Sequence, residues 1–288
     1  MTEPLVSVIC LCYNHARYVQ EAIQSVLNQT YPHIELIVVD DASTDESVAA
    51  IEHALVGRAD VRFIRHELNV GYTRSFNKAW KLCSGEFVID LAADDVLRPD
   101  RIARGVAALQ QAGPAYGIQF SDGEYIDEAG ETQGLHSIRF PHAHVPQGDV
   151  YEQVISRYFI LSPSMMVRQS VLVALGGYDE SLAYEDFDLW IRAARDFKFL
   201  YLPQPLVKKR ILSSSMSAAQ FAFRSPQQET TYRVLHKAMK LNRTQREQVA
   251  LAHRVRYEIR TCLRLGLWKL AFRYGQLLRQ NKQLKYQS

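Results

Sequence analysis

Residues 35–43 read Glu-Leu-Ile-Val-Val-Asp-Asp-Ala-Ser, an apolar run that ends in two aspartates and a serine. The length and the β-branched residues of 35–40 predict a buried strand. Ser43 and Glu46 have the spacing of a capping box, so a helix is expected over residues 44–55. A strand that leads through a polar loop into a helix is the repeating unit of an open α/β sheet.

The same unit recurs on both sides of this stretch. Apolar runs predict strands at 5–11, 61–65 and 86–91, and apolar residues at helical spacing predict helices at 18–28 and 75–83. We therefore expect an α/β fold whose mixed, mostly parallel sheet is flanked by helices. Residues 114–150 have a weaker pattern of short strands and loops. Further elements are expected in the order helix 154–160, helix 169–175, helix 184–196, a strand at 199–206 that prolines end, and only helices after Ser217.

The chain has 288 residues, which favours one large domain with an appendage. Its apolar runs are too short to span a bilayer, and the start, Met1-Thr2-Glu3-Pro4, has no basic region typical of a signal peptide. We expect a cytoplasmic protein. The four cysteines lack the spacing of a zinc site and are expected to be free thiols.

The last 46 residues differ from the rest in charge. From Arg243 onward there are 11 Lys or Arg and 2 acidic residues, about +9, whereas the whole chain carries +3. Leucines such as Leu263 and Leu277 alternate there with basic residues such as Arg260 and Arg273. Such helices can lie against an anionic membrane, or their apolar stripe can pack on the rest of the protein or in a homodimer. No recognisable motif accompanies the charge, so nucleic acid is not an expected partner.

Three acidic pairs stand at places where the predicted fold would put a ligand: Asp40-Asp41 and Asp94-Asp95 follow strands, and Glu185-Asp186 begins a helix. Carboxylates that bind Mg²⁺ or Mn²⁺ commonly hold a diphosphate. Each pair also has a structural explanation, as a helix cap, a solvated turn or a partner of the helix dipole. Their recurrence in order favours a nucleotide site.

The chain resembles the family 2 glycosyltransferases of GT-A fold, from about Val6 to Ser217. The matching stretches, in order, are Ser7-Val8-Ile9 through Tyr13-Asn14, residues 25–31, Leu36 through Ser43, Asn69-Val70-Gly71, Asn77, Gly85-Glu86-Phe87, residues 93–99, Gly176-Gly177-Tyr178-Asp179-Glu180 and residues 185–190. This implies a catalytic domain at 1–217 and a basic helical region at 218–288.

The resemblance also implies roles for single residues. Asp186 would be the general base of an inverting reaction, with Glu185 beside it, and Asp94 and Asp95 would bind Mn²⁺ or Mg²⁺. Tyr13 would stack on the nucleobase and Asp41 would accept a hydrogen bond from it. The implied nucleotide contacts are Leu11, Tyr13, Asn14, Asp41, Gly71, Asn77, Asp94 and Arg210.

The implied reaction moves a sugar from a nucleoside diphosphate sugar, with UDP as the expected nucleotide, to a hydroxyl of a saccharide or lipid-linked saccharide. Surface polysaccharide or glycolipid synthesis of bacterial type is the expected pathway. The Gln-x-x-Arg-Trp signature of processive synthases is absent, which favours addition of a single sugar.

Two positions depart from the family pattern: Ala92 replaces an acid of the metal motif, and Leu212 replaces a histidine near the diphosphate. They leave open a weak or inactive nucleotide-sugar-binding module of the same fold. A receiver-like signalling domain would have its acidic pair after the first strand rather than the second. A nucleotidyltransferase would have a Gly-rich loop where Tyr13-Asn14 stand.

Overall fold

The computed structural model describes residues 3–140, 145–212 and 226–284. The chain forms two compact units that are not continuous in sequence. Unit 1 comprises Met1–Gly148, Ile160–Tyr178 and Phe197–Leu212, and unit 2 comprises Asp149–Phe159, Asp179–Asp196 and Ser213–Ser288. The expected boundary at 217–218 lies outside the described residues. The C-terminal helices share unit 2 with two segments from earlier in the chain.

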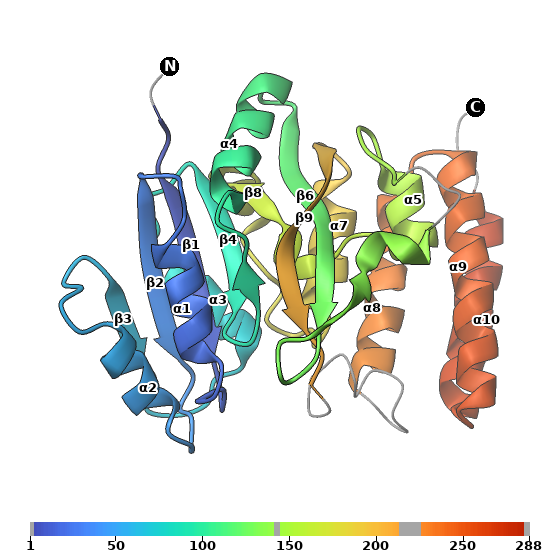
Figure 1. Cartoon of the computed structure of the whole chain (residues 1–288). Helices are drawn as coiled ribbons and strands as arrows, with labels where there is room; N and C mark the ends of the chain where they lie inside the picture. The colour runs from blue at the N-terminus through green and yellow to red at the C-terminus, as the bar shows by residue number, and fades with distance from the viewer. Residues whose placement is uncertain (1–2, 141–144, 213–225, 285–288) are drawn as a thin grey trace. The chain divides into compact units, whose positions relative to one another are not determined.

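Unit 1 is built on one mixed β-sheet (Figure 1). Its strands are β1 (Val6–Cys12), β2 (Ile34–Asp40), β3 (Arg62–Arg65), β4 (Phe87–Ala92), β5 (Val96–Leu97), β6 (Tyr116–Ile126), β7 (Thr132–Leu135), β8 (Met166–Arg168) and β9 (Lys198–Arg210). In the described residues their order is β3-β2-β1-β4-β8-β6-β9-β5, with β7 beside β6. The strands from β3 to β4 are parallel, and β8 is antiparallel to both β4 and β6. The prediction of a mixed sheet flanked by helices is confirmed.

The helices fall into two groups by unit. Unit 1 contains α1 (Val19–Leu27), α2 (Ser47–Ala54), α3 (Tyr72–Trp80), α4 (Arg101–Ala112), α6 (Gln169–Leu175) and the short 3₁₀ turns η1 (His136–Arg139) and η2 (Ser162–Ser164). Unit 2 contains α5 (Tyr151–Ser156), α7 (Glu185–Ala193), α8 (Pro226–Leu241), α9 (Gln245–Arg264) and α10 (Trp268–Gln283). Among the described residues, no helix is long and apolar enough to cross a bilayer.

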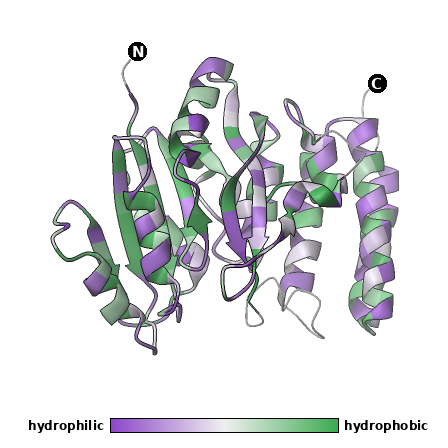
Figure 2. Cartoon of the chain, in the orientation of Figure 1, coloured by the Kyte–Doolittle hydropathy of each residue, from purple (hydrophilic) through white to green (hydrophobic). Residues whose placement is uncertain are grey.

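The core of unit 1 lies on both faces of β1, all seven residues of which are buried. Val6, Val8, Cys10 and Cys12 pack in one cluster with apolar residues of α1, α2 and α4. The alternate residues of β1 are also buried, and α3 contacts this strand. Figure 2 shows the central strands as mostly hydrophobic. Each fully buried Val or Ile contributes about 1.5–3 kcal/mol, which is why this strand reads as a continuous apolar run.

Three local predictions are wrong. The helix expected at 154–160 is α5, which begins at Tyr151 and ends at Ser156. The helix expected at residue 44 begins at Ser47, and Ser43 is not its cap, because its Oγ instead accepts the N–H of Asn14 at 2.9 Å. A capping box is present at the start of α9, between Thr244 and Glu247. The contact of Ser43 with a loop from another strand replaces the local contact that its spacing suggested.

The prolines at 203 and 205 do not end the strand, since β9 continues to Arg210. The register of β9 against β6 shifts between Leu202 and Pro205, so the two strands are not paired residue by residue there. A bulge tolerates a residue without an N–H, whereas a regular ladder does not. The region expected to be irregular also contains β6, a strand of 11 residues.

The turn after α6 provides a test of the fold. Gly176 and Gly177 both have positive φ, at 72° and 77°, but only Gly177 is crowded: a Cβ there would overlap Oδ1 of Asn77. We expect Gly177→Ala to lower the free energy of unfolding by about 3 kcal/mol, from backbone strain and the loss of hydrogen bonds. Gly176→Ala is the matched control and should cost about 1 kcal/mol, because no atom lies within 4 Å of its Cβ. Equal urea midpoints for the two variants would contradict this.

Candidate functional site

The loops that follow β1 and β2 are held together by short polar side chains. Asn14 has a left-handed backbone with φ 57°, and its Oδ1 accepts the N–H of Thr44 at 2.8 Å. The N–H of His15 donates to Oγ of Ser47 at 2.9 Å. Between these contacts Tyr13 is 46% exposed. Its ring is accessible to a ligand, and the loop that carries it is fixed.

Asp41, which follows β2, is a carboxylate with several hydrogen-bond partners. Its two oxygens accept the N–H groups of Val70 at 2.9 Å and Gly71 at 2.8 Å, and His66 Nδ1 lies 3.0 Å away. Burial by itself would raise the pKa of Asp41, but these hydrogen bonds outweigh it and hold the pKa below the usual value. Asp41 therefore stays ionised and ties the loop before α3 to the end of β2.

The neighbouring Asp40 is fully buried. Its Oδ1 accepts the N–H of Ser43 at 3.0 Å, and within the described residues its Oδ2 has no hydrogen-bond partner. Leu11, another predicted nucleotide contact, is 5% exposed, and its carbonyl accepts the N–H of Ala93 at 2.9 Å. The ends of β1, β2 and β4 are thus linked to one another by backbone bonds.

Asp94 and Asp95 form the turn that follows β4. Asp95 is 4% exposed, and its Oδ1 accepts the backbone N–H of Arg210 at 2.9 Å. Burial, together with the charge of Asp94, raises the pKa of Asp95 to about 8. The pair is therefore a place where added positive charge would be stabilised.

Arg210 connects this turn to other parts of unit 1. Its guanidinium donates to the carbonyls of Asp94 at 3.1 Å and Asp127 at 3.0 Å, pairs with Glu21 at 2.6 Å, and lies over the ring of Tyr18. These bonds use three of the five N–H groups of the guanidinium, and Arg210 is 3% exposed. The sequence analysis did not select Glu21, because no motif distinguishes it from other polar residues of a helix.

The two departures from the family pattern have different environments. Leu212 is 5% exposed and packs as an apolar side chain, whereas Ala92 is half-buried at the end of β4. Within residues 3–140, 145–212 and 226–284, no three His, Cys, Asp or Glu side chains are arranged to hold a metal ion. Mg²⁺ and Mn²⁺ are commonly held by one or two carboxylates together with substrate phosphates, a donor set that Asp94 and Asp95 fit.

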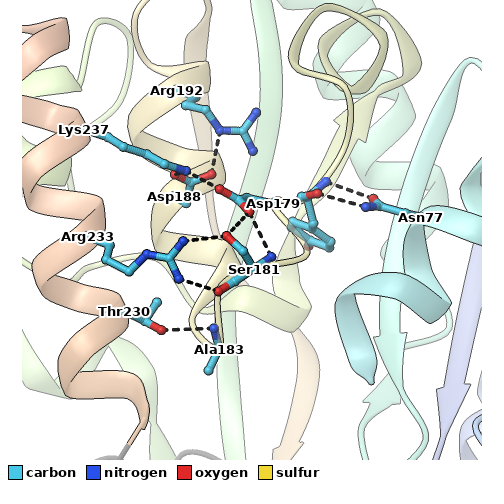
Figure 3. Close-up of polar contacts among 10 residues, drawn as sticks. Asn77, Asp179, Ser181, Ala183, Asp188, Arg192, Thr230, Arg233 and Lys237 are labelled. Carbon is cyan, nitrogen blue, oxygen red and sulfur yellow. Dashed lines mark hydrogen bonds and ion pairs between the residues drawn. The ribbon is translucent and has the colours of Figure 1, made fainter. Parts of the chain in front are cut away.

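Asn77 is buried, and its amide holds the turn after α6. Its Nδ2 donates to the carbonyl of Tyr178 and its Oδ1 accepts the N–H of the same residue, both at 2.9 Å (Figure 3). Tyr178 also donates from its hydroxyl to Asp90 at 3.0 Å. In this structure the amide of Asn77 positions a loop, so its role as a nucleotide contact stays a prediction.

In unit 2, Glu185 and Asp186 occupy the first turn of α7, where the helix dipole favours negative charge. Glu185 is buried and Asp186 is partly exposed. The following residues Phe187 and Trp190 are buried, and Trp190 packs against the ring of Tyr184. The apolar face of α7 therefore fixes the direction in which its first turn presents its acids.

The segment before α7 is held by basic and polar side chains of α8, which sequence reasoning missed (Figure 3). Lys237 pairs with Asp179 at 2.5 Å and with the buried Asp188 at 2.7 Å. Arg233 donates to Ser181 at 2.7 Å and 2.8 Å. Although burial alone would raise it, the pKa of Asp179 is held well below its usual range, chiefly by Lys237. The position of Glu185 and Asp186 thus depends on residues about 50 positions later.

Unit 2 also has an open cavity of about 640 Å³, lined by residues of α5 and α9 such as Ser156 and His253. It contains none of the residues that the sequence analysis selected. Tyr13, Asp41, Asp94 and Asp95 of unit 1 lie instead at the carboxyl ends of β1, β2 and β4, where parallel sheets bind ligands.

The hydrogen bonds to Asp41 predict how the stability of the protein depends on pH. Folding lowers the pKa of Asp41. Its contribution to the free energy of unfolding is therefore complete above about pH 4 and is lost as the pH falls below that value. We expect Asp41→Asn to lower the free energy of unfolding at pH 7 by about 2–3 kcal/mol, and the difference from wild type to shrink at pH 3. Amide hydrogen exchange at Val70 and Gly71 should be faster in the variant.

The control is Asp60→Asn, which removes an exposed carboxylate paired with Arg58. It should leave the exchange at Val70 and Gly71 unchanged. Unaltered exchange at these two amides in Asp41→Asn would show that the carboxylate does not hold this loop.

Residues 7–171 match the family model of glycosyl transferase family 2. An uncharacterized glycosyltransferase of Methanocaldococcus jannaschii is 31% identical over 215 residues, which cover 73% of this chain and 72% of the relative. One of Rickettsia prowazekii is 30% identical over 210 residues, covering 72% of this chain and 64% of the relative.

Solved structures agree on the fold. The S. aureus TarS fragment 1–349 in complex with UDP-GlcNAc has a TM-score of 0.65 and 20% identity, and the match covers 87% of this chain and 71% of TarS. The mannosyltransferase PcManGT of Pyrobaculum calidifontis, in complex with GDP-Man and Mn²⁺, also has a TM-score of 0.65, with 16% identity over 98% of this chain and 85% of PcManGT. The matched residues and the identity over most of the chain show that this protein is a glycosyltransferase that belongs to glycosyl transferase family 2.

Proposed function

We propose that the protein transfers a single sugar, with inversion, from a nucleoside diphosphate sugar to a hydroxyl of a saccharide or lipid-linked saccharide. The observation that carries this is the gathering of Tyr13, Asp41, Asp94 and Asp95 at the carboxyl ends of three parallel strands. The exposed ring of Tyr13 is suited to stack on the base of the donor. The carboxyl groups of Asp94 and Asp95, in the turn after β4, are suited to bind a cation at its diphosphate.

UDP is the proposed nucleotide, and the comparisons give it partial support. TarS was solved with UDP-GlcNAc and PcManGT with GDP-Man, so similar folds accept either base. Leu11, Asn14 and Gly71 lie in or beside the strand ends, and we propose that they contribute to binding of the base and ribose. Asn77 and Arg210 hydrogen-bond to the surrounding loops. We propose that each either contacts the nucleotide directly or positions a loop that does.

We propose that Asp94 and Asp95 hold Mn²⁺ or Mg²⁺ together with phosphate oxygens of the donor. Such a cation neutralises charge on the leaving diphosphate. The raised pKa of Asp95 supports the assignment, since a carboxyl that is hard to ionise in isolation gains most from a nearby positive charge. PcManGT, with a similar fold, was solved with Mn²⁺.

Asp186 is the proposed general base, with Glu185 beside it. The acceptor oxygen forms a bond to the anomeric carbon on the face opposite the diphosphate, and its proton passes to the Asp186 carboxylate as the bond to the diphosphate breaks. Transfer in one displacement needs no covalent intermediate with the protein. We place the reaction in the synthesis of surface polysaccharide or glycolipid of bacterial type.

The first test is calorimetric titration with UDP, GDP and CDP, with and without Mn²⁺. We expect one nucleotide to bind in a metal-dependent way and Asp95→Ala to lower its affinity by about tenfold or more, because a charge-assisted contact is lost. Asp100→Ala, which removes an exposed acid paired with Arg104, is the control and should bind as wild type. If none of the nucleotides binds, the proposed donor site is wrong.

The second test separates donor binding from chemistry. Asp186→Asn should leave nucleotide affinity unchanged and lower the rate of sugar transfer by about 10²–10⁴-fold, since general-base catalysis contributes about that much. Asp196→Asn, an exposed acid of the same unit, is the matched control. Wild-type nucleotide binding without any transfer to candidate acceptors would favour an inactive binding module, to which Ala92 and Leu212 also point.

A further inference from the structure

The exposed charges of α9 and α10 all have one sign. Residues 245–284 include two acids, Glu247 and Glu258, and both are buried. Glu247 closes the capping box of α9 and pairs with Arg195 at 2.9 Å, and Glu258 accepts a hydrogen bond from Arg254 at 2.7 Å. The exposed Lys and Arg side chains in this described stretch are Arg246, Arg256, Arg260, Arg264, Lys269, Arg279 and Lys282. A solvated helix surface normally mixes both signs, and this one does not.

Large apolar side chains are exposed next to these charges, around the turn that joins the two helices. Leu263 is 42% exposed, Trp268 is 68% exposed and Phe272 is 65% exposed. Trp268 and Phe272 are one turn apart on the same side of α10, whereas the buried residues Ala271, Tyr274 and Leu277 lie on the other side. The core of unit 2 therefore does not use the two aromatic rings.

We call the residues Arg260, Leu263, Arg264, Trp268, Lys269 and Phe272 the hairpin tip. They lie within two helical turns of Gly266, whose positive φ of 69° allows α9 to end and α10 to begin. Figure 1 shows α9 and α10 side by side, and Figure 2 shows hydrophobic and hydrophilic residues mixed along them. The tip thus combines three basic and three apolar side chains at one end of a helix pair.

We propose that the hairpin tip is a membrane-binding surface that inserts Leu263, Trp268 and Phe272 among the headgroups of an anionic phospholipid bilayer. Tryptophan favours this depth, because its ring is apolar and its N–H finds water or phosphate. Arg260, Arg264 and Lys269 contact the lipid phosphates, and the remaining cations of both helices add long-range attraction.

The same charges argue against a second copy of the chain as the occupant. A twofold dimer through the tip would bring basic residues of the two copies close together, because the charged residues of the tip, Arg260, Arg264 and Lys269, are all positive. A bilayer that contains anionic lipid provides the complementary charge together with an apolar layer for the rings. This surface is independent of the proposed transfer reaction, so either proposal can fail without the other.

The test uses the full chain and vesicles of phosphatidylcholine, with or without about 30% phosphatidylglycerol, at about 0.1 M salt. We expect flotation with the anionic vesicles only, and release at about 0.5 M salt. Of the three tryptophans, Trp80 and Trp190 are buried, so the exposed Trp268 reports contact with lipid. Its emission should move to shorter wavelength and be quenched by brominated lipid.

Two variants separate the contributions to binding. Trp268→Ser with Phe272→Ser should weaken partition by more than tenfold, and the change of Arg260, Arg264 and Lys269 to Gln should weaken it by about a hundredfold, at about fivefold per basic residue. Val56→Ser with Leu68→Ser, which removes exposed apolar side chains from unit 1, is the control and should bind vesicles as wild type. Thermal unfolding should be unchanged in all three proteins.

Absence of flotation in the wild type would overturn the proposal, as would equal flotation of the wild type and the Trp268 and Phe272 double variant. Light scattering that finds a dimer which the same double variant dissociates would assign the tip to a second copy of the chain. Binding to single-stranded RNA but not to vesicles, lost in the basic triple variant, would assign it to nucleic acid.

Discussion

The parallel pairing of β1 with β2 on one side and β4 on the other is the constraint on which the rest of unit 1 depends. The pairing joins Cys12 to Asp40 and Leu11 to Ala92, so three strands end at the same level. A shift of one residue would move every side chain of β1 to the opposite face, and since both faces are packed such a shift would disrupt both. The loops that carry the candidate site are therefore placed by the apolar core and not by a ligand.

Asp41 and Asp95, at the carboxyl ends of β2 and β4, are both buried but differ in how their charge is compensated. Burial of a carboxylate is costly unless hydrogen bonds or positive charge compensate it. Asp41 is compensated within the protein, because two N–H groups and His66 meet its oxygens, and it serves as a rigid connection between loops. Asp95 receives one N–H and stands beside a second acid, so its pKa remains raised to about 8. A cation beside this pair of acids would favour the ionised form of Asp95, so the turn after β4 is suited to a cation.

Unit 2 uses charge in a different way. The segment that leads to Glu185 and Asp186 is fixed by two residues of α8. Lys237 pairs with Asp179 and the buried Asp188, and Arg233 donates hydrogen bonds to Ser181. Further along, α9 buries its two acids and most of Arg254, whereas Arg246, Arg256, Arg260 and Arg264 are exposed. The surface of residues 245–284 is therefore more basic than their composition alone suggests.

The order of elements in unit 1, the family and the acids at the strand ends could be predicted from the sequence, because each depends on periodicity or on residues close together in the chain. The predicted boundaries of α2 and β9 were wrong because distant residues replaced local partners. Ser43 bonds to Asn14 instead of capping a helix, and β9 continues beyond its prolines because its register against β6 shifts there. No local pattern links Lys237 to Asp179, or reveals that Asn77 holds Tyr178. Sequence determines what each segment can form by itself; the contacts that hold Asp41, Asp95 and Asp188 were decided by tertiary structure, since they join residues that only packing brings together.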